Sequence, residues 1–180
     1  MHRGSIIFLL TVVLLVGSIF TGCVPVRGTA EWYIEQGNSL VEEGRYDEAI
    51  EAYTNAIELD PNMADAYFER AWAYNELEQY DLAITDLSQA IELDPNDAEF
   101  YGNRAYAYLN TGQYDLAITD CDKAIELNPD EAEAYRNRGL AYKAQGKNAE
   151  AIADFEKVLD LSTDPELVDS ANQALSELGV

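Results

Sequence analysis

Histidine and cysteine are almost missing from this chain of 180 residues. The single histidine, His2, lies in the N-terminal leader, so the remainder has no imidazole to act as general base or metal ligand. The two cysteines are Cys23, at the end of the leader, and Cys121, at an apolar position where we expect a small buried side chain. If Cys23 is modified, no disulfide can form within the chain. These scarcities disfavour metal binding and catalysis by cysteine or histidine.

Basic residues are also scarce. The chain has 11 Lys and Arg against 34 Asp and Glu, which gives a net charge of −23. Such a charge argues against nucleic acid, whose phosphates require Lys and Arg, and against a chain that lies flat on an anionic membrane. The simplest interpretation is a set of acidic, solvated helix faces, and the alternative is a dedicated binder of a basic partner.

Motifs of reaction chemistry are absent from the sequence as well. There is no Gly-rich phosphate loop, no nucleophile elbow and no Cys/His set with metal-ligand spacing. The segment 94–97, Asp-Pro-Asn-Asp, lacks the twelve-residue loop and terminal Glu of a calcium site. Glu58, Glu92 and Glu126 recur at a fixed step, which marks them as scaffold. The sequence therefore predicts no enzyme activity, no cofactor, no metal site and no small-molecule substrate.

Residues 1–22 have the pattern of an export signal. A short basic start precedes the apolar segment 6–16, and small residues follow it. The ending Phe-Thr-Gly-Cys at 20–23 resembles the lipobox of bacterial lipoproteins. That resemblance implies cleavage before Cys23, lipid on this cysteine, and a short tether over 23–29. The alternative is an uncleaved anchor helix of about 21 residues over 6–26, near the minimum length that spans a bilayer.

A period of 34 residues runs through the rest of the chain. Ala-Ile pairs begin at 49, 83, 117 and 151, prolines stand at 61, 95 and 129, and tyrosines at 33, 67, 101 and 135. Such self-similarity predicts a solenoid of helix pairs, in which each pair buries its apolar face on the next. We divide the repeats into units 30–63, 64–97, 98–131 and 132–165, followed by a capping helix within 166–180.

Each unit is predicted to hold two helices. The first helices are expected near 31–43, 64–77, 98–111 and 132–145, and the second near 46–59, 80–93, 114–127 and 148–161. Gly44, Gly112 and Gly146 lie between the two helices, where a left-handed residue ends the first. Glu78 replaces this glycine in the second unit, so strain or a different turn is expected there.

The recurring segments Tyr-x-x-x-Ala/Gly-x-x-Tyr, Tyr-Asp-x-Ala-Ile and Ala-Ile-Glu-Leu-x-Pro resemble the tetratricopeptide repeat over residues 30–161. This resemblance implies an all-α fold, an α-solenoid of four tetratricopeptide helix pairs with a C-terminal capping helix. It also implies a protein-interaction module that binds a partner segment in its concave groove. The carboxylate clamp known in this family does not carry over, because Ile34 and Glu99 stand where it has cations and Trp72 where it has Asn.

A comparison of the units separates packing from binding. One stripe of each first helix is nearly constant, as in Tyr67-Ala71-Tyr74, and is assigned to the core. The next stripe varies, and the resemblance implies that it lines the groove. Its candidate peptide-binding residues, with a basic end made by the last two, are Phe68, Trp72, Asn75, Tyr106, Leu109, Arg136 and Lys143. The alternative is that these aromatic side chains pack against neighbouring repeats.

Two further positions recur in three of the four units. Arg70, Arg104 and Arg138 are 34 residues apart, and so are Asp86, Asp120 and Asp154. The first unit lacks both, with Gln36 and Ala52 in their places. This joint absence predicts structural ion pairs between the two helices of one unit rather than ligands.

The sequence as a whole predicts an exported, membrane-anchored interaction module that serves as an assembly or adaptor factor in the cell envelope, at the outer membrane, the periplasm or the cell surface. The predicted partner is a protein segment with apolar anchors and basic flanks, because Glu35, Glu42, Glu69, Glu76 and Glu99 surround the variable stripe. The alternative is a structural or oligomeric scaffold that is held by an uncleaved N-terminal helix and has no peptide-binding groove.

Overall fold

The computed structural model describes residues 26–180, and all regular structure in this range is helical. The predicted leader over 1–22 and the lipidation candidate Cys23 lie outside the described residues. The helices of the described range are α1 (Ala30–Glu42), α2 (Tyr46–Leu59), α3 (Ala64–Glu76), α4 (Tyr80–Leu93), α5 (Ala98–Asn110), α6 (Tyr114–Leu127), α7 (Ala132–Ala144), α8 (Asn148–Leu161) and α9 (Pro165–Leu178). The predicted all-α solenoid of four helix pairs and a capping helix is confirmed.

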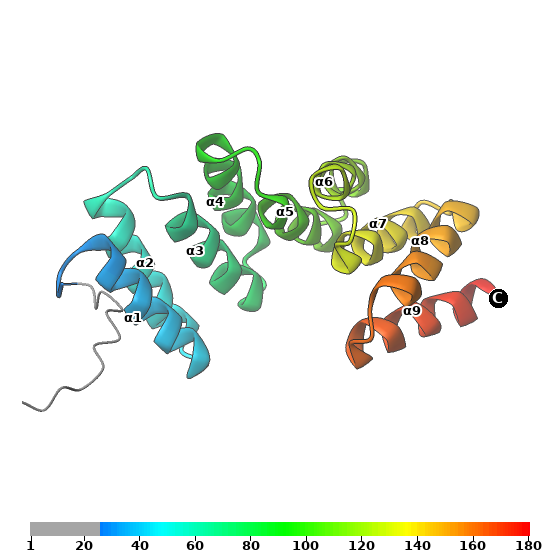
Figure 1. Ribbon diagram of the computed structural model, residues 1–180, viewed down its shortest axis with the longest axis horizontal. Coiled ribbons are helices and arrows are strands. Elements are labelled where there is room, and N and C mark those ends of the chain that lie inside the picture. The colour runs from blue at the N-terminus through cyan, green and yellow to red at the C-terminus, as the bar shows by residue number, and fades with distance from the viewer. Residues whose placement is uncertain (1–25) are drawn as a thin grey trace, which may run out of the picture.

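The helix pairs stack in chain order into a curved array (Figure 1). We call α1, α3, α5 and α7 the first helices and α2, α4, α6 and α8 the second helices. Each first helix contacts the next first helix, and α7 also contacts α9, whereas no two second helices of the described chain contact each other. The first helices and α9 therefore line the inner, concave face, as expected when helix pairs twist by a constant angle.

The turn inside each pair depends on one left-handed residue. Gly44, Gly112 and Gly146 have φ between 72° and 74°, and Glu78 occupies the same position with φ 57°. A side chain at such a φ costs about 1–2 kcal/mol because Cβ approaches the following carbonyl oxygen. The second unit thus keeps the turn geometry of the others and bears strain in place of a changed turn.

Small residues let the two helices of each pair approach. A Cβ added to Gly37 would lie 2.6 Å from Tyr53 Cζ, and one added to Gly139 would lie 2.9 Å from Phe155 Cε1. The inner units have Ala at this position, Ala71 and Ala105, and carry a smaller side chain, Leu87 or Cys121, on the second helix. Glycine on the first helix thus accompanies a large ring on the second, and alanine accompanies a smaller side chain. Burial raises the pKa of the Cys121 thiol although Arg138 opposes it, which leaves an inert, small core side chain.

Three arginines connect neighbouring helices across the array. Arg104 donates from Nε and Nη2 to the two carboxylate oxygens of Asp120 in its own unit, at 2.7 and 2.8 Å. Its Nη1 donates to Ser88 Oγ of the preceding second helix at 3.0 Å. Equivalent bonds join Arg70 to Asp86 and Thr54, and Arg138 to Asp154 and Asp122. One guanidinium therefore fixes three helices at once.

Each of these guanidinium groups lies between two tyrosine rings of its own helix. Arg104 Cζ is 5.9 Å from the ring centre of Tyr101 and 5.8 Å from that of Tyr108. Burial alone would lower the pKa of Arg104, but the hydrogen bonds and charge of Asp120 raise it overall. Asp120 is only 5% exposed. The pair is thus a charged, hydrogen-bonded element inside the helix interface.

The last helix covers the open end of the array. Pro165 begins α9, and the Asp164 carboxylate accepts from the backbone N–H groups of Glu166 and Leu167 at 3.0 and 3.2 Å. Ala171, Ala174 and Leu175 pack on the buried side chains of α8. Because the apolar face of α9 is buried against α8 in this way, the N-terminal turn of α9 is held at one end of the concave face.

We expect Glu78→Gly to raise the free energy of unfolding by about 0.5–1 kcal/mol, because relief of left-handed strain outweighs the extra freedom of glycine in the unfolded chain. The reciprocal change, Gly112→Glu, places the same strain in the third unit, where an added Cβ meets no atom within 4 Å. It should lower stability by about 1–2 kcal/mol. Denaturant unfolding of both variants checks this, and equal stabilities would contradict it.

We expect Arg104→Met to destabilise the fold by about 3–5 kcal/mol, because it leaves the Asp120 carboxylate buried without its partner. The double variant Arg104→Met with Asp120→Leu should lose about 1–3 kcal/mol less free energy of unfolding than the two single variants lose together. The matched control is the pair Arg45–Glu48, whose side chains are 47% and 56% exposed. Its coupling energy should be about 0–1 kcal/mol. Additive single changes at 104 and 120 in denaturant unfolding would contradict the structural role.

Candidate functional site: a cavity on the concave face

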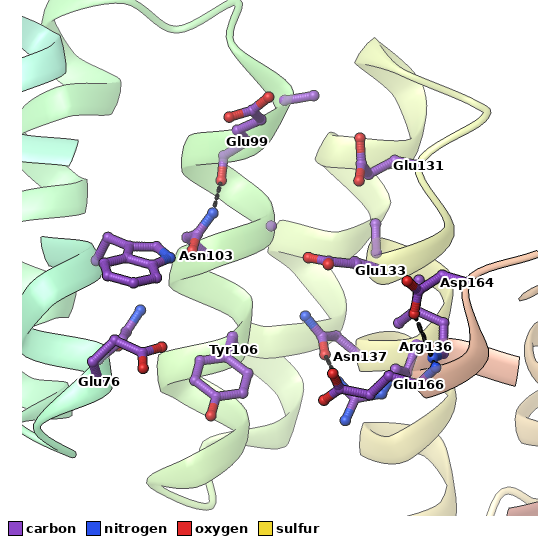
Figure 2. Close-up of a pocket in the computed structure, with 16 residues that line it drawn as sticks. Glu76, Glu99, Asn103, Tyr106, Glu131, Glu133, Arg136, Asn137, Asp164 and Glu166 are labelled. Atoms are coloured by element: carbon purple, nitrogen blue, oxygen red, sulfur yellow. Dashed lines mark hydrogen bonds between the residues drawn. The ribbon is translucent and has the colours of Figure 1, made fainter. Parts of the chain in front are cut away.

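A cavity of about 590 Å³ opens on the concave face between α3, α5, α7 and the start of α9 (Figure 2). Its walls come from three consecutive units and from the capping helix, so it exists only because the array curves. The lining residues are Trp72, Asn75, Glu76, Ala98, Glu99, Gly102, Asn103, Tyr106, Glu131, Glu133, Ala134, Arg136, Asn137, Asp164, Glu166 and Leu167.

The structure brings together part of the predicted peptide-binding stripe. Trp72, Asn75, Tyr106 and Arg136 all line the cavity, together with Gly102, whose missing side chain leaves open space. These residues project from three successive first helices at equivalent or neighbouring positions. The helical spacing of the variable stripe is what collects them on one face.

The other three residues of the stripe do not line the cavity. Phe68 packs against the core formed by α3, α4 and α5, with its ring centre 5.1 Å from that of Phe100 on α5. The Lys143 ammonium pairs with the Glu177 carboxylate of α9. Leu109 is half-buried outside the cavity wall. The apolar centre is therefore smaller than the sequence suggested, and the basic end is not formed.

The rings of Trp72 and Tyr106 pack against the preceding unit and also face the cavity. The Trp72 ring contacts Tyr46 of α2 edge-to-face at 5.9 Å, and the Tyr106 ring contacts Tyr80 of α4 at 6.1 Å. Each is only half-buried, and each still lines the cavity. One part of each ring thus packs on the preceding unit, and another part faces the cavity.

Carboxylates dominate the cavity wall. Glu76, Glu99, Glu131, Glu133, Asp164 and Glu166 line it, against one cation, Arg136. Arg136 Nε donates to Ser170 Oγ at 3.0 Å, and Figure 2 shows its side chain beside Asp164 and Glu166. Within residues 26–180, none of the six carboxylates forms an ion pair. The cavity therefore has a negative potential that its own side chains leave uncompensated.

The acidic surroundings are reflected in shifted pKa values. Burial raises the pKa of Glu131, and the neighbouring Glu133 raises it further, although a hydrogen bond from Asn128 opposes this. Burial also raises the pKa of Glu69, on the same helix as Trp72, with added repulsion from Asp65 and Glu99. Burial is the main cause of both shifts, and the neighbouring carboxylates add to it.

Several lining residues were not assigned from the sequence. Asn103 and Asn137 are 34 residues apart, and Glu133 is 34 residues after Glu99, which the sequence had placed beside the stripe. Comparison of the units could therefore have placed Asn103, Asn137 and Glu133 on this face. Asp164 lies at the very end of the fourth unit and Glu166 directly follows that unit, at the start of the capping helix. Only the packing of α9 brings them to the cavity.

Two other kinds of site were sought in the described range. No cluster of three His, Cys, Asp or Glu side chains within residues 26–180 is arranged to hold a metal ion. Over the same residues, the helices are too short or too polar to cross a lipid bilayer. Asn38 of α1 accepts a hydrogen bond from the buried Tyr53 hydroxyl at 2.7 Å, so its amide oxygen is used within the first unit.

The stacked helix pairs define an α-solenoid repeat protein with a cavity on its concave face. Models of the tetratricopeptide repeat match residues 34–98, 98–131 and 132–163. The chain therefore belongs to the tetratricopeptide repeat family. Repeats of this family are protein-interaction modules.

Solved structures show the same architecture. A crystal structure of MamA is 30% identical over 73% of this chain and 77% of that one, with a TM-score of 0.69. The first tetratricopeptide domain of Spaghetti (RPAP3), bound to the HSP90 peptide SRMEEVD, is 29% identical over 65% of this chain and 95% of that one, with a TM-score of 0.63. A thermophilic repeat protein of Thermus thermophilus shares the fold, with a TM-score of 0.74 at 21% identity over 83% of each chain.

Curated relatives match over a shorter stretch. The small glutamine-rich tetratricopeptide repeat-containing protein beta of human, mouse and rat is 46% identical over 44 residues. This match covers 24% of this chain and 14% of those proteins. The similarity is thus to their repeats alone.

Proposed function

We propose that this chain is an exported lipoprotein whose concave cavity binds a segment of a partner protein, and that it serves as an assembly or adaptor factor in the cell envelope. The observation that carries the binding role is the cavity itself. It lies on the concave face of a tetratricopeptide solenoid and presents the free sides of two large aromatic rings, Trp72 and Tyr106. Aromatic side chains in a groove are common anchors for a docked peptide.

The partner segment differs from the peptide in the Spaghetti complex, whose sequence SRMEEVD ends in acidic residues. The cavity here is lined by six carboxylates and one guanidinium, so an acidic terminus would be repelled. Apolar residues flanked by Lys or Arg suit it better. The charge would act mainly on the association rate and would weaken with salt.

The anchor is proposed from the sequence alone. The export-signal pattern and the Phe-Thr-Gly-Cys ending support cleavage before Cys23 and lipid on this residue. Only residues 24–29 would then separate the lipid from the first helix, a reach of roughly 20 Å when fully extended. The repeat array would consequently act close to its membrane, where its partner must also present its segment.

We expect the double change Trp72→Ala and Tyr106→Ala to abolish capture of at least one envelope protein that the full chain captures from a detergent extract. The matched control is Trp32→Ala, because Trp32 lies on α1 outside the cavity. Circular dichroism confirms folding, since both cavity rings also pack on tyrosines of the preceding unit. An unchanged set of captured proteins would favour the oligomeric scaffold.

We expect the intact mass of the detergent-extracted protein to show loss of residues 1–22 and an added lipid at Cys23. The reason is the small-residue ending after a short apolar core, which suits cleavage better than permanent insertion. The control is Cys23→Ser, which should retain the leader or leave the membrane fraction. A wild-type mass that includes Met1, or an unlipidated Cys23, would refute the anchor and support an uncleaved helix.

A further inference from the structure

One polar side chain of the cavity wall has no partner in the folded chain. Asn75 is 6% exposed, and neither its Nδ2 nor its Oδ1 makes a hydrogen bond. It is the sole buried side chain of the described residues whose polar atoms are left without a partner. A buried amide without hydrogen bonds is costly, so its retention needs a reason.

Packing of the repeat does not supply that reason. The positions equivalent to Asn75 in the other units hold Val41, Leu109 and Lys143. Two of these are apolar side chains of similar size, so the solenoid tolerates an apolar residue at this place. The amide is specific to the second unit, the unit that contributes Trp72 and Glu76 to the cavity.

We infer that the cavity is a subsite for a lysine or arginine residue of an extended peptide segment, whose main chain pairs with the Asn75 amide. The inference rests on the proposed function and specifies the residue that the cavity selects. The cation is one of the basic residues that flank the apolar anchors of the partner segment.

The chemistry of the wall selects both parts of this ligand. The six unpaired carboxylates require positive charge, and the free face of Trp72 stabilises an ammonium or guanidinium group by cation–π attraction. Asn75 offers one donor group and one acceptor. A peptide group supplies the matching C=O and N–H, whereas a polyamine supplies donors alone. A cationic peptide residue is therefore the ligand that satisfies the whole site.

The Asn75 amide is covered in the free chain, so the incoming segment has to displace a lining side chain. Glu76 follows Asn75 in the sequence, is exposed, and is held only by the Tyr46 hydroxyl at 3.4 Å. Glu76 lines the cavity and is exposed, so its carboxylate is available at the rim as a partner for the cation.

The test uses the full chain in detergent micelles and an array of immobilised heptapeptides with randomised flanks. The central residue of each peptide is Lys, Arg, norleucine or Glu. Peptides with central Lys or Arg should bind about tenfold more tightly than their norleucine counterparts, and Glu peptides should not bind. Equal binding of Lys and norleucine peptides would overturn the cation subsite while leaving the proposed groove intact, because such binding would still depend on Trp72.

Variants separate the roles of charge and amide. Glu99→Gln with Glu133→Gln should reduce the Lys preference about tenfold. The control Glu92→Gln, an exposed residue of a second helix outside the cavity, should not change it. Asn75→Leu should raise the melting temperature and weaken peptide binding about tenfold. A lower melting temperature with unchanged binding would show that Asn75 is structural and overturn its role.

Two further outcomes complete the test. Asn110→Leu is the matched amide control, because Asn110 is exposed and its Nδ2 already donates to the Tyr106 carbonyl at 2.8 Å. It should leave affinity and melting temperature unchanged. Spermidine is offered as a competitor, and it should displace the Lys peptides only at much higher concentration. If spermidine binds as tightly as the peptides and independently of Asn75, the ligand is a polyamine and the inference fails.

Discussion

The bidentate pair between an arginine of α3, α5 or α7 and an aspartate of the following second helix fixes where these helices of the solenoid lie. A guanidinium has a rigid planar fork, so two bonds to Asp120 set both the distance and the rotation between α5 and α6. The third bond, to Ser88, extends the same constraint to the preceding unit. Hydrophobic burial drives the helices together, but it is not directional and would permit sliding. The first unit, with Gln36 and Ala52, has no such ion pair, and its helices are joined by packing and by the hydrogen bond from the Tyr53 hydroxyl to Asn38.

The geometry of the concave face follows from these arginine–aspartate pairs. When three successive first helices are held in register, Trp72, Tyr106 and Arg136 meet across a cavity although they are 34 or 30 residues apart in pairs. The capping helix closes one end and adds two carboxylates. A site of this kind needs no strained backbone or catalytic group. It is a surface built from repeated helices whose exposed residues differ from unit to unit. The positions that differ are those at which a partner can be recognised.

The 34-residue period made the helix pairs, their order and the core stripe predictable, because the four units can be compared with one another position by position. The second helices have the expected bounds, and α3, α5 and α7 end one residue earlier than expected. The cavity was less predictable. Phe68 belongs to the variable stripe, yet its ring turns into the core beside Phe100. The Lys143 ammonium pairs with the Glu177 carboxylate of α9, and Asp164 lines the cavity from the N-cap of the same helix. Spacing gives the helix face of a residue, but not the rotamer or the partner that decides its role.

The size-matched contacts inside the pairs have a consequence for how such a chain can change. A glycine faces Tyr53 or Phe155 in the outer units, and an alanine stands at this position with Leu87 or Cys121 in the inner ones. If a second helix from an inner unit were recombined with an outer first helix, it would leave a void, and the reverse exchange would clash. Whole units are therefore the smallest segments that duplication or shuffling can exchange freely. Recombination is therefore tolerated between helix pairs, and the two helices of one pair have to evolve together.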